Sequence, residues 1–353
     1  MTLDNFMKQG KASFILGGQY GSEGKGGAAA FTAVELARRN KAFEIITANN
    51  GANSGHTSIH GGKKEVLFHL PTASIYPVNG IHPITYLNAG AIIDPVLLLL
   101  ELSNRPKEYV DKFFIHPNAA IITQECKDAE GRADSAQTKI ASTRKGVGEA
   151  LSRKVLRSGM VAKEHLLLQP YIKALDLNDM MLRGLSVLVE IPQGHSLSID
   201  GGFYPHTTSR NCTVMQAMSD AGIHPHFYHR SMLVARTFPI RVGNIGENSS
   251  GGHFPDQQEV GWESIGVDPE ITTVTKRVRR VFTFSEQQFA AALAQTRPHV
   301  IYLTFMDYLP KGTELIYVDR IRQLSRKHGL QNCDPEIVTQ WGPSTDDVIT
   351  GTW

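Results

Sequence analysis

The sequence is poor in the features that mark secreted, zinc-stapled or membrane-spanning proteins. Its 353 residues include three cysteines, Cys126, Cys212 and Cys333, which lie far apart and form no Cys-x-x-Cys pair. This pattern argues against a disulfide framework and against a structural zinc site. The longest apolar run, residues 95–100, is too short to cross a bilayer, and the run at residues 14–16 is too short for a signal-peptide core. We therefore expect a cytoplasmic protein with no membrane partner.

The sequence also lacks a strong excess of charge of one sign. Lysine and arginine number 36 against 34 aspartates and glutamates, which gives a net charge of +2. This balance is no general argument for a nucleic acid or a membrane surface as partner. Four cations do stand together at residues 276–280, but no aromatic residues are interleaved with them to stack on bases. The cluster suits a small anionic substrate as well as a phosphate backbone, and we do not expect nucleic acid as a partner.

What the chain does contain is an alternation of strand-like and helix-like segments. Residues 12–17 form a short apolar run that ends in glycines, and residues 28–39 then have a helical composition. Strand, glycine-rich turn and helix make up the opening unit of nucleotide-binding α/β folds. We predict further strands at residues 44–48, 65–70, 186–191, 232–237 and 300–304, and further helices at residues 95–103, 148–157, 211–221 and 313–328.

This alternation runs along the whole chain, without an internal repeat or an obvious linker. The simplest interpretation is one large α/β domain over residues 1–353, built around a mainly parallel central sheet. The loop-rich stretch 243–268 is the best candidate for a mobile or inserted region.

The turn at residues 21–26 (GSEGKG) has the composition of a phosphate site. A glycine-rich turn before a helix exposes backbone N–H groups and the positive end of the helix dipole, and both favour phosphate. Lys25 adds the point charge that a transferring phosphoryl group needs. The turn is not a Walker A loop, because Gln19 stands at the first glycine position and Gly26 at the Ser/Thr position. Taken alone, the turn is equally consistent with a tight strand-to-helix connection and a solvated lysine.

Five sequence strings in the same order carry a resemblance to a known family. They are residues 18–26 (GQYGSEGKG), residues 53–57 (NSGHT), the stretch 193–211 with its Gln-Gly, Tyr-Pro and Thr-Thr-Ser-x-Asn, residues 241–243 (RVG) and residues 275–280 (TKRVRR). Together they resemble the adenylosuccinate synthetase family, and with weaker matches the resemblance extends over residues 14–345. It implies the P-loop-NTPase-like α/β fold of that family.

The resemblance implies a ligase of purine biosynthesis that acts in two steps. The γ-phosphate of a nucleoside triphosphate moves to O6 of a purine nucleotide, and the amine of L-aspartate then displaces the 6-phosphoryl group to form a C–N bond. Phosphorylation turns a poor leaving group into a good one. The resemblance also implies Mg²⁺ as cofactor and a homodimer, because Arg157 falls on a position that reaches the other subunit's site. By itself, Arg157 is also consistent with a solvated arginine at a helix end.

The resemblance assigns roles to individual residues. Catalysis falls to Lys25 and His56, which stabilise the transferring phosphoryl group, and to position 22, where this chain has Ser22. The alternative for His56 is a histidine held in a loop by its own hydrogen bonds.

The expected ligand contacts fall into four sets. The triphosphate set is Gly21, Glu23, Gly24, Lys25, Gly26, Gly55, His56, Thr57, Phe305, Asp307, Gln340 and Gly342. The acceptor-nucleotide set is Ser22, Asn53, Thr143, Arg157, Gln193, Thr208 and Arg277. The aspartate set is Thr275 and Arg279, and the metal set is Ser22 and Gly55. An alternative for the basic cluster that contains Arg279 is a solvated strand.

Ser22 departs from the family pattern, which has an aspartate that acts as a base near N1 of inosinate and binds magnesium. A serine cannot serve as a carboxylate base near neutral pH, but its hydroxyl can donate and accept and leaves room for the 2-amino group of guanine. The other motif residues are kept, which argues against a dead enzyme. The pattern resembles the phage branch of the family that makes 2-aminoadenine nucleotides from dGMP, and a phage-encoded chain would act in the host cytoplasm.

Phe305 is the second departure. The family has Thr-Lys-Leu-Asp where this chain has residues 304–307 (TFMD), and the family lysine packs on the guanine of GTP. Asp307 is retained, and an aromatic ring can still stack on a purine. The donor is therefore expected to be ATP or dATP, with GTP as the alternative. A core role at a strand end is the other interpretation of Phe305.

Three other functions remain open at this point. One is an ordinary adenylosuccinate synthetase that acts on IMP with GTP. Another is a catalytically silent nucleotide-binding protein that has lost its base at position 22. The third is a nucleic-acid-binding module that uses the basic cluster at residues 276–280.

Overall fold

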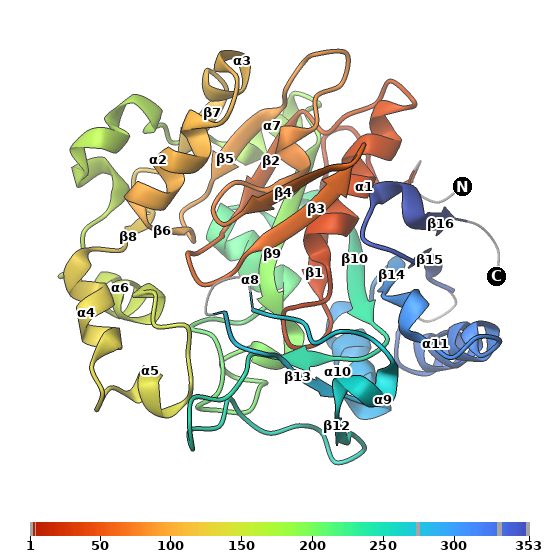
Figure 1. Ribbon diagram of the computed structural model, residues 1–353. Coiled ribbons are helices and arrows are strands. Elements are labelled where there is room, and N and C mark those ends of the chain that lie inside the picture. The colour runs from red at the N-terminus through yellow and green to blue at the C-terminus, as the bar shows by residue number, and fades with distance from the viewer. Residues whose placement is uncertain (1–2, 4, 273–275, 330–333, 351–353) are drawn as a thin grey trace.

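The central feature of the computed structural model is a nine-stranded sheet (Figure 1). The structure describes residue 3 and residues 5–272, 276–329 and 334–350. Within them the strand order is β16-β15-β14-β10-β1-β9-β2-β5-β7, and every neighbouring pair is parallel except β15 and β16. The strands are β1 (Ala12–Gly17), β2 (Ile45–Ala48), β5 (Ile84–Leu87), β7 (Phe113–Ile115), β9 (Val187–Gly194), β10 (Tyr228–Arg236), β14 (Val300–Thr304), β15 (Glu336–Gln340) and β16 (Val348–Thr350).

Short strands and helices surround this sheet. The remaining strands are β3 (His56–His60) and β4 (Lys63–Leu67), which pair as a hairpin, β6 (Ile92–Ile93) with β8 (Ala120–Ile121), and β11 (Ile240–Arg241) and β12 (Glu259–Val260) on either side of β13 (Arg280–Phe282). The helices are α1 (Lys25–Ala37), α2 (Pro95–Ser103), α3 (Lys107–Val110), α4 (Gln124–Gly131), α5 (Ala136–Lys139), α6 (Val147–Val155), α7 (Leu177–Leu182), α8 (Val214–Ala221), α9 (Trp262–Ile265), α10 (Glu286–Thr296) and α11 (Glu314–His328). No described helix has both the length and the apolar character that a bilayer crossing requires.

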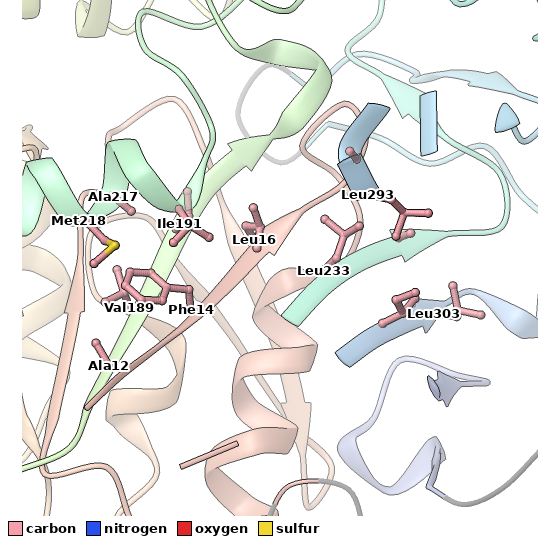
Figure 2. Close-up of a cluster of buried hydrophobic side chains, with 14 of the residues drawn as sticks. Ala12, Phe14, Leu16, Val189, Ile191, Ala217, Met218, Leu233, Leu293 and Leu303 are labelled. Carbon is pink, nitrogen blue, oxygen red and sulfur yellow. The ribbon is translucent and has the colours of Figure 1, made fainter. Parts of the chain in front are cut away.

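The sheet is covered on both faces, so the strands β1, β2 and β14 are buried along their whole length. Side chains of β1 divide between the two faces, and Figure 2 shows those of Ala12, Phe14 and Leu16 in the cluster on one face. Phe14 and Leu16 join a core cluster with α8, α10 and α11, whereas Ile15 joins a second cluster with α1. Because β9 and β10 both pair parallel with β1, the carboxyl ends of the three strands lie at one edge of the sheet. This is the edge where ligands bind in open α/β sheets.

The predicted parallel α/β architecture is confirmed, and most errors are at element boundaries. The strands at 12–17 and 300–304 and the helix at 95–103 have their predicted bounds. The helix expected at 28–39 begins earlier, at Lys25, because Gly24 adopts a left-handed conformation (φ 85°) directly before it. The helix expected at 211–221 begins later, because the side chain of Thr213 caps it.

The strand predicted at residues 65–70 is confirmed at residues 65–67 but is wrong in its extent. The strand is β4, which ends at Leu67 and pairs only with β3, outside the central sheet. Residues 68–70 turn away because Glu101 of α2, 7% exposed, accepts the backbone N–H groups of Phe68, His69 (3.1 Å) and Leu70 (3.0 Å). This carboxylate fixes the hairpin that begins at His56.

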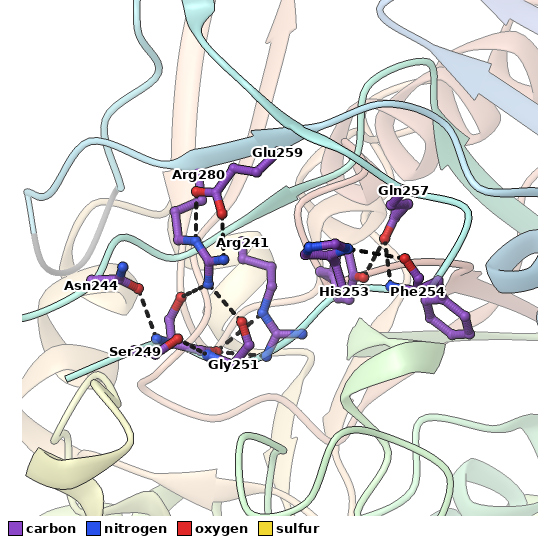
Figure 3. Close-up of polar contacts among 11 residues, drawn as sticks. Arg241, Asn244, Ser249, Gly251, His253, Phe254, Gln257, Glu259 and Arg280 are labelled. Carbon is purple, nitrogen blue, oxygen red and sulfur yellow. Dashed lines mark hydrogen bonds and ion pairs between the residues drawn. The ribbon is translucent and has the colours of Figure 1, made fainter. Parts of the chain in front are cut away.

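The loop-rich stretch 243–268 contains two short elements, β12 and α9, and two arginines hold its first part (Figure 3). Arg241 donates to the carbonyl of Ser250, at 2.7 Å from Nη2. Arg280, its cross-strand partner, donates to the Gly251 carbonyl (2.7 Å) and binds both carboxylate oxygens of Glu259. These contacts fold the loop onto the edge of the sheet beside the strand ends.

The contacts of Glu101 lead to a stability prediction. Glu101→Ala leaves three buried N–H groups without an acceptor, so we expect the free energy of unfolding to fall by about 3 kcal/mol in urea denaturation. Glu108→Ala, at an exposed position of the neighbouring helix α3, is the matched control and should change it by less than about 0.5 kcal/mol. Equal effects of the two substitutions would contradict the anchoring role.

Candidate active site

A cavity of about 160 Å³ lies where the carboxyl ends of β1 and β9 meet. Five of the residues expected at the acceptor nucleotide line it, together with Gly21 and Gly55 and with Arg279 from the aspartate set. These five are Ser22, Asn53, Thr143, Gln193 and Thr208. Residues from five separate stretches of the chain, at positions 21–22, 53–55, 143, 193–208 and 279, thus converge on one cavity, as the resemblance implied.

Behind the cavity wall, the glycine-rich turn is organised around a buried ion pair. The ammonium of Lys25 donates to Oε2 of Glu23 (2.8 Å) and to the carbonyl of Gly21 (2.8 Å). The other carboxylate oxygen, Oε1, accepts the backbone N–H groups of Gln19 (3.0 Å) and Gly21 (2.7 Å). The Glu23 carboxylate therefore acts as an internal anion of the turn, and its position favours support of the loop over direct contact with a phosphate.

Gly26 is required by packing at the start of α1. A Cβ atom at this position would lie 2.6 Å from the carbonyl oxygen and 2.9 Å from the nitrogen of Thr57, closer than real Cβ contacts allow. This close approach brings the first turn of α1 against β3. It explains why the Ser/Thr of a Walker A loop has no counterpart here, and it sets Lys25 near His56.

His56 is buried and neutral. Burial, followed by the charge of Lys25, lowers the pKa of His56 to about 3. Its Nε2 lies 3.3 Å from the hydroxyl of Ser54, which lines the cavity. A neutral imidazole carries one N–H, so His56 can donate a hydrogen bond to a phosphoryl oxygen without adding a second cation beside Lys25.

Ser22 is bound to the aspartate-set arginine. Nη1 of Arg279 donates to the Ser22 hydroxyl at 2.7 Å. Burial lowers the pKa of Arg279 to about 10, so the guanidinium stays charged at neutral pH. Because Ser22 accepts this bond, its own proton and a second lone pair are available to a ligand in the cavity.

Arg277 contacts the cavity wall rather than the cavity itself. Its guanidinium donates to the carbonyls of Gly243 (2.6 Å), Ala141 (3.1 Å) and Ser142 (3.3 Å). Ala141 has a left-handed backbone (φ 51°), which is unfavourable for alanine. Arg277 thus holds the loop that leads to Thr143. Thr275, predicted to bind aspartate, lies outside the described residues.

Side chains expected to contact the donor base lie beside the first turn of α1. Phe305 follows β14 and Gln340 ends β15. Cβ atoms built on Gly24 and Gly27 would lie 3.8 Å from the Phe305 ring and 3.3 Å from the Gln340 amide. Asp307 is exposed nearby. These side chains lie beside the first turn of α1, the end that favours phosphate.

Two further predicted site residues, Gly342 and Arg157, lie in loops. Gly342 is in the loop after β15, where the Asp347 carboxylate accepts the backbone N–H of Ser344 (2.8 Å). Arg157 follows α6, is exposed, and has a left-handed backbone (φ 62°). It does not line the cavity of its own chain.

Sequence reasoning missed several residues that shape the cavity. Tyr20, Ser54, His206, Arg241 and Ser250 line it but were assigned no role. Tyr20, Ser54 and Arg241 stand inside the strings that carry the family resemblance, so the signal was available. His206 also stands inside the 193–211 stretch, whereas Ser250 reaches the cavity because Arg241 binds its backbone carbonyl, which no spacing in the sequence indicates.

Comparison with known proteins places this arrangement in a family. The family model described as adenylosuccinate synthetase matches residues 14–176 and 167–319. N6-succino-2-amino-2'-deoxyadenylate synthase of Vibrio phage phiVC8 is 35% identical, with 94% of this chain and 95% of the relative covered. Adenylosuccinate synthetase of Thermococcus onnurineus is 32% identical, with 95% and 97% covered.

A solved structure agrees with the sequence relatives. The succinoaminodeoxyadenylate synthetase of Cyanophage S-2L, solved with dGMP and with dATP as an energy donor, has a TM-score of 0.84 and 30% identity, and covers 96% of this chain and 95% of its own. The agreement of motifs, cavity, sheet order and relatives leads to one conclusion. The chain belongs to the adenylosuccinate synthetase family of C–N bond-forming ligases.

Proposed function

We propose that this chain phosphorylates O6 of dGMP with a purine nucleoside triphosphate and then joins L-aspartate at C6. The products are N6-succino-2-amino-2'-deoxyadenylate, the nucleoside diphosphate and phosphate. The observation that carries the proposal is the neutral Ser22, bound to Arg279, where the family has an aspartate base. The named activity of the phage relatives supports it.

Ser22 favours a guanine base for reasons of charge and space. The 2-amino group of guanine lies beside N1 and needs an acceptor and room. The Ser22 hydroxyl keeps one lone pair free after it accepts from Arg279, and it is smaller than a carboxylate. Ser22 cannot act as a base and accept the N1 proton at neutral pH. We assign that role to water or a phosphate oxygen.

The phosphoryl step uses Lys25 and His56. As O6 attacks the γ-phosphorus and the diphosphate leaves, negative charge on the transferring group is met by the ammonium of Lys25 and the N–H of His56. Lys25 would exchange its bond to the Gly21 carbonyl for a phosphoryl oxygen and keep Glu23 as its counter-ion. In the second step the aspartate amine bonds to C6 and the phosphate leaves.

The site can bind magnesium with the Gly55 carbonyl as a ligand but without a carboxylate at position 22. Ser22 is a poor ligand because the Arg279 cation lies 2.7 Å from its hydroxyl oxygen. The Gly55 carbonyl remains, and phosphate oxygens of the donor supply most of the shell that Mg²⁺ prefers. Bound there, the ion would neutralise charge on the β- and γ-phosphates.

The remaining proposed contacts follow the two groups of side chains. The donor, ATP or dATP, would place its base at Phe305, Asp307, Gln340 and Gly342, and its phosphates near Gly24, Gly26 and Thr57. dGMP would bind Asn53, Thr143, Gln193 and Thr208, and Arg279 with Thr275 would bind aspartate. Arg157 would complete the acceptor site of a second subunit, so the enzyme acts as a homodimer in the host cytoplasm.

A substrate panel tests the activity. Purified protein is incubated with aspartate, Mg²⁺ and dATP, ATP or GTP, and dGMP, GMP and IMP are compared by mass detection of the succinyl adduct. We expect dGMP to give the adduct and IMP to give little, because position 22 accommodates the 2-amino group. Better turnover of IMP would make the chain an ordinary adenylosuccinate synthetase, and no product from any acceptor would favour a silent protein.

Ser22→Asp restores the family residue and should shift the preference away from dGMP. We expect kcat/KM for dGMP to fall at least tenfold, the effect of losing one good polar contact, about 1.4 kcal/mol. Ser103→Asp, the same substitution at an exposed position of α2 away from the cavity, is the control for general disturbance. Unchanged dGMP turnover in the aspartate variant would count against the role of Ser22.

The neutral state of His56 leads to a prediction for pH. Its pKa when folded, about 3, is below the unfolded value of 6.5, so the unfolded chain binds more protons between these values. The contribution of His56 to the free energy of unfolding is therefore fully present above pH 6.5. It decreases as the pH falls, by about 2 kcal/mol at pH 5. His56→Gln should flatten the acid side of the stability curve, whereas Ser103→Gln, at an exposed position of α2, should leave its slope unchanged.

Shared sites in the proposed homodimer can be tested by complementation. Arg157→Ala and Lys25→Ala should each be nearly inactive alone. After unfolding and refolding as an equal mixture, about one quarter of the sites should combine an intact Lys25 with an intact Arg157 from the partner. No recovery of activity in the mixture would contradict a site shared between subunits.

A further inference from the structure

Arg236, at the end of β10, is a fully buried cation that no proposed step uses. It is 1% exposed. Its Nη2 lies 2.5 Å from Oε1 of Glu270, and Nη1 donates to the other carboxylate oxygen at 3.3 Å. Burying a charge this deeply costs much free energy unless it is paired, and Glu270 supplies the counter-ion.

The same guanidinium reaches the glycine-rich turn. Nη1 donates to the backbone carbonyl of Ser22 at 3.2 Å. The backbone of Arg236 also exchanges two hydrogen bonds with the side-chain amide of Gln19, at 3.0 and 3.1 Å. Arg236 thus contacts the turn at Gln19, before Gly21, and at Ser22, after it.

Phe305 lies on the face of this guanidinium. The central carbon of the Arg236 guanidinium is 3.8 Å from the centroid of the Phe305 ring, a short cation–π distance. Phe305 has a left-handed backbone (φ 58°), which is unfavourable for a bulky residue, and the Thr237 hydroxyl donates to its carbonyl at 2.7 Å. One face of the ring is therefore occupied, and the strained backbone is held from two sides.

We propose that Arg236 is a positioning residue that fixes Phe305 as the platform for the donor base and joins that platform to the turn that carries Ser22. The inference rests on the proposed function, since it takes Phe305 as the site of the donor purine. The guanidinium under one face of the ring withdraws negative potential from it, so the opposite face stacks better on an electron-rich purine. The family's lysine at position 305 would instead put a second cation against Arg236.

Donor binding without catalysis is the direct test. Titration calorimetry measures the affinity of dATP with Mg²⁺, and separately of dGMP, for the full chain and for Arg236→Lys and Arg236→Met. Lysine keeps the charge but lacks the planar fork, and methionine removes both. We expect dATP binding to weaken about tenfold, the effect of losing one desolvated cation–π contact, and dGMP binding to change much less.

A matched control separates positioning from folding. Arg105 is also mostly buried and pairs with Glu65, away from the cavity, so Arg105→Lys should leave the dATP affinity unchanged. Unchanged dATP affinity in a folded Arg236→Lys, or equal losses for dATP and dGMP, would overturn the inference. The product assay on the unaltered chain is an independent measurement. If that chain makes no succinyl product but the Arg236 variants still lose dATP binding selectively, the inference stands and the proposed function is rejected.

A double-mutant cycle remains informative even if Arg236→Met is unstable. Phe305→Lys in the unaltered background places two cations in contact, so its thermal midpoint should fall by about 5 °C. In the Arg236→Met background the same change should cost much less, because the repulsion is gone. Equal costs in both backgrounds would show that the two positions are uncoupled and would overturn the inference.

Discussion

The buried pair of Glu23 and Lys25 is the constraint on which the rest of the site depends. Its carboxylate accepts two backbone N–H groups of the turn and holds the ammonium in place, so the turn is braced by its own residues. Helix α1 then begins at Lys25, Gly26 lets it approach β3, and His56 is set beside the ammonium. A preorganised cation with a neutral donor next to it is the arrangement that phosphoryl transfer requires.

On this fixed frame, we propose that two departures from the family pattern change what the site accepts. Ser22 has a hydroxyl where the family has a carboxylate, and this hydroxyl accepts a hydrogen bond from Arg279. The change alters the surroundings of the proposed acceptor base. Phe305 replaces a family lysine by a ring that lies on Arg236, which alters the surroundings of the donor base. Arg236 contacts both positions, so the two departures belong to one connected set of side chains.

Sequence reasoning predicted the architecture from local signals and part of the cavity lining from the family strings. An apolar run before a glycine-rich turn indicates a buried strand, and the family strings indicate which segments converge. It did not predict that Glu23 would bind its own turn or that Arg277 would bind carbonyls of the cavity wall, because these partners depend on backbone direction. The strand expected at 65–70 was wrong in its extent because Glu101, distant in sequence, captures residues 68–70.

The central claim is that Lys25 and His56 meet the transferring phosphoryl group while Ser22 tolerates the guanine 2-amino group. A crystal structure with dGMP and a non-hydrolysable ATP analogue tests it most directly. The account predicts the Lys25 ammonium and the His56 imidazole at about 3 Å from γ-phosphate oxygens, with the Ser22 hydroxyl beside the 2-amino nitrogen. A complex in which both side chains stay with their present partners, away from the phosphates, would contradict it.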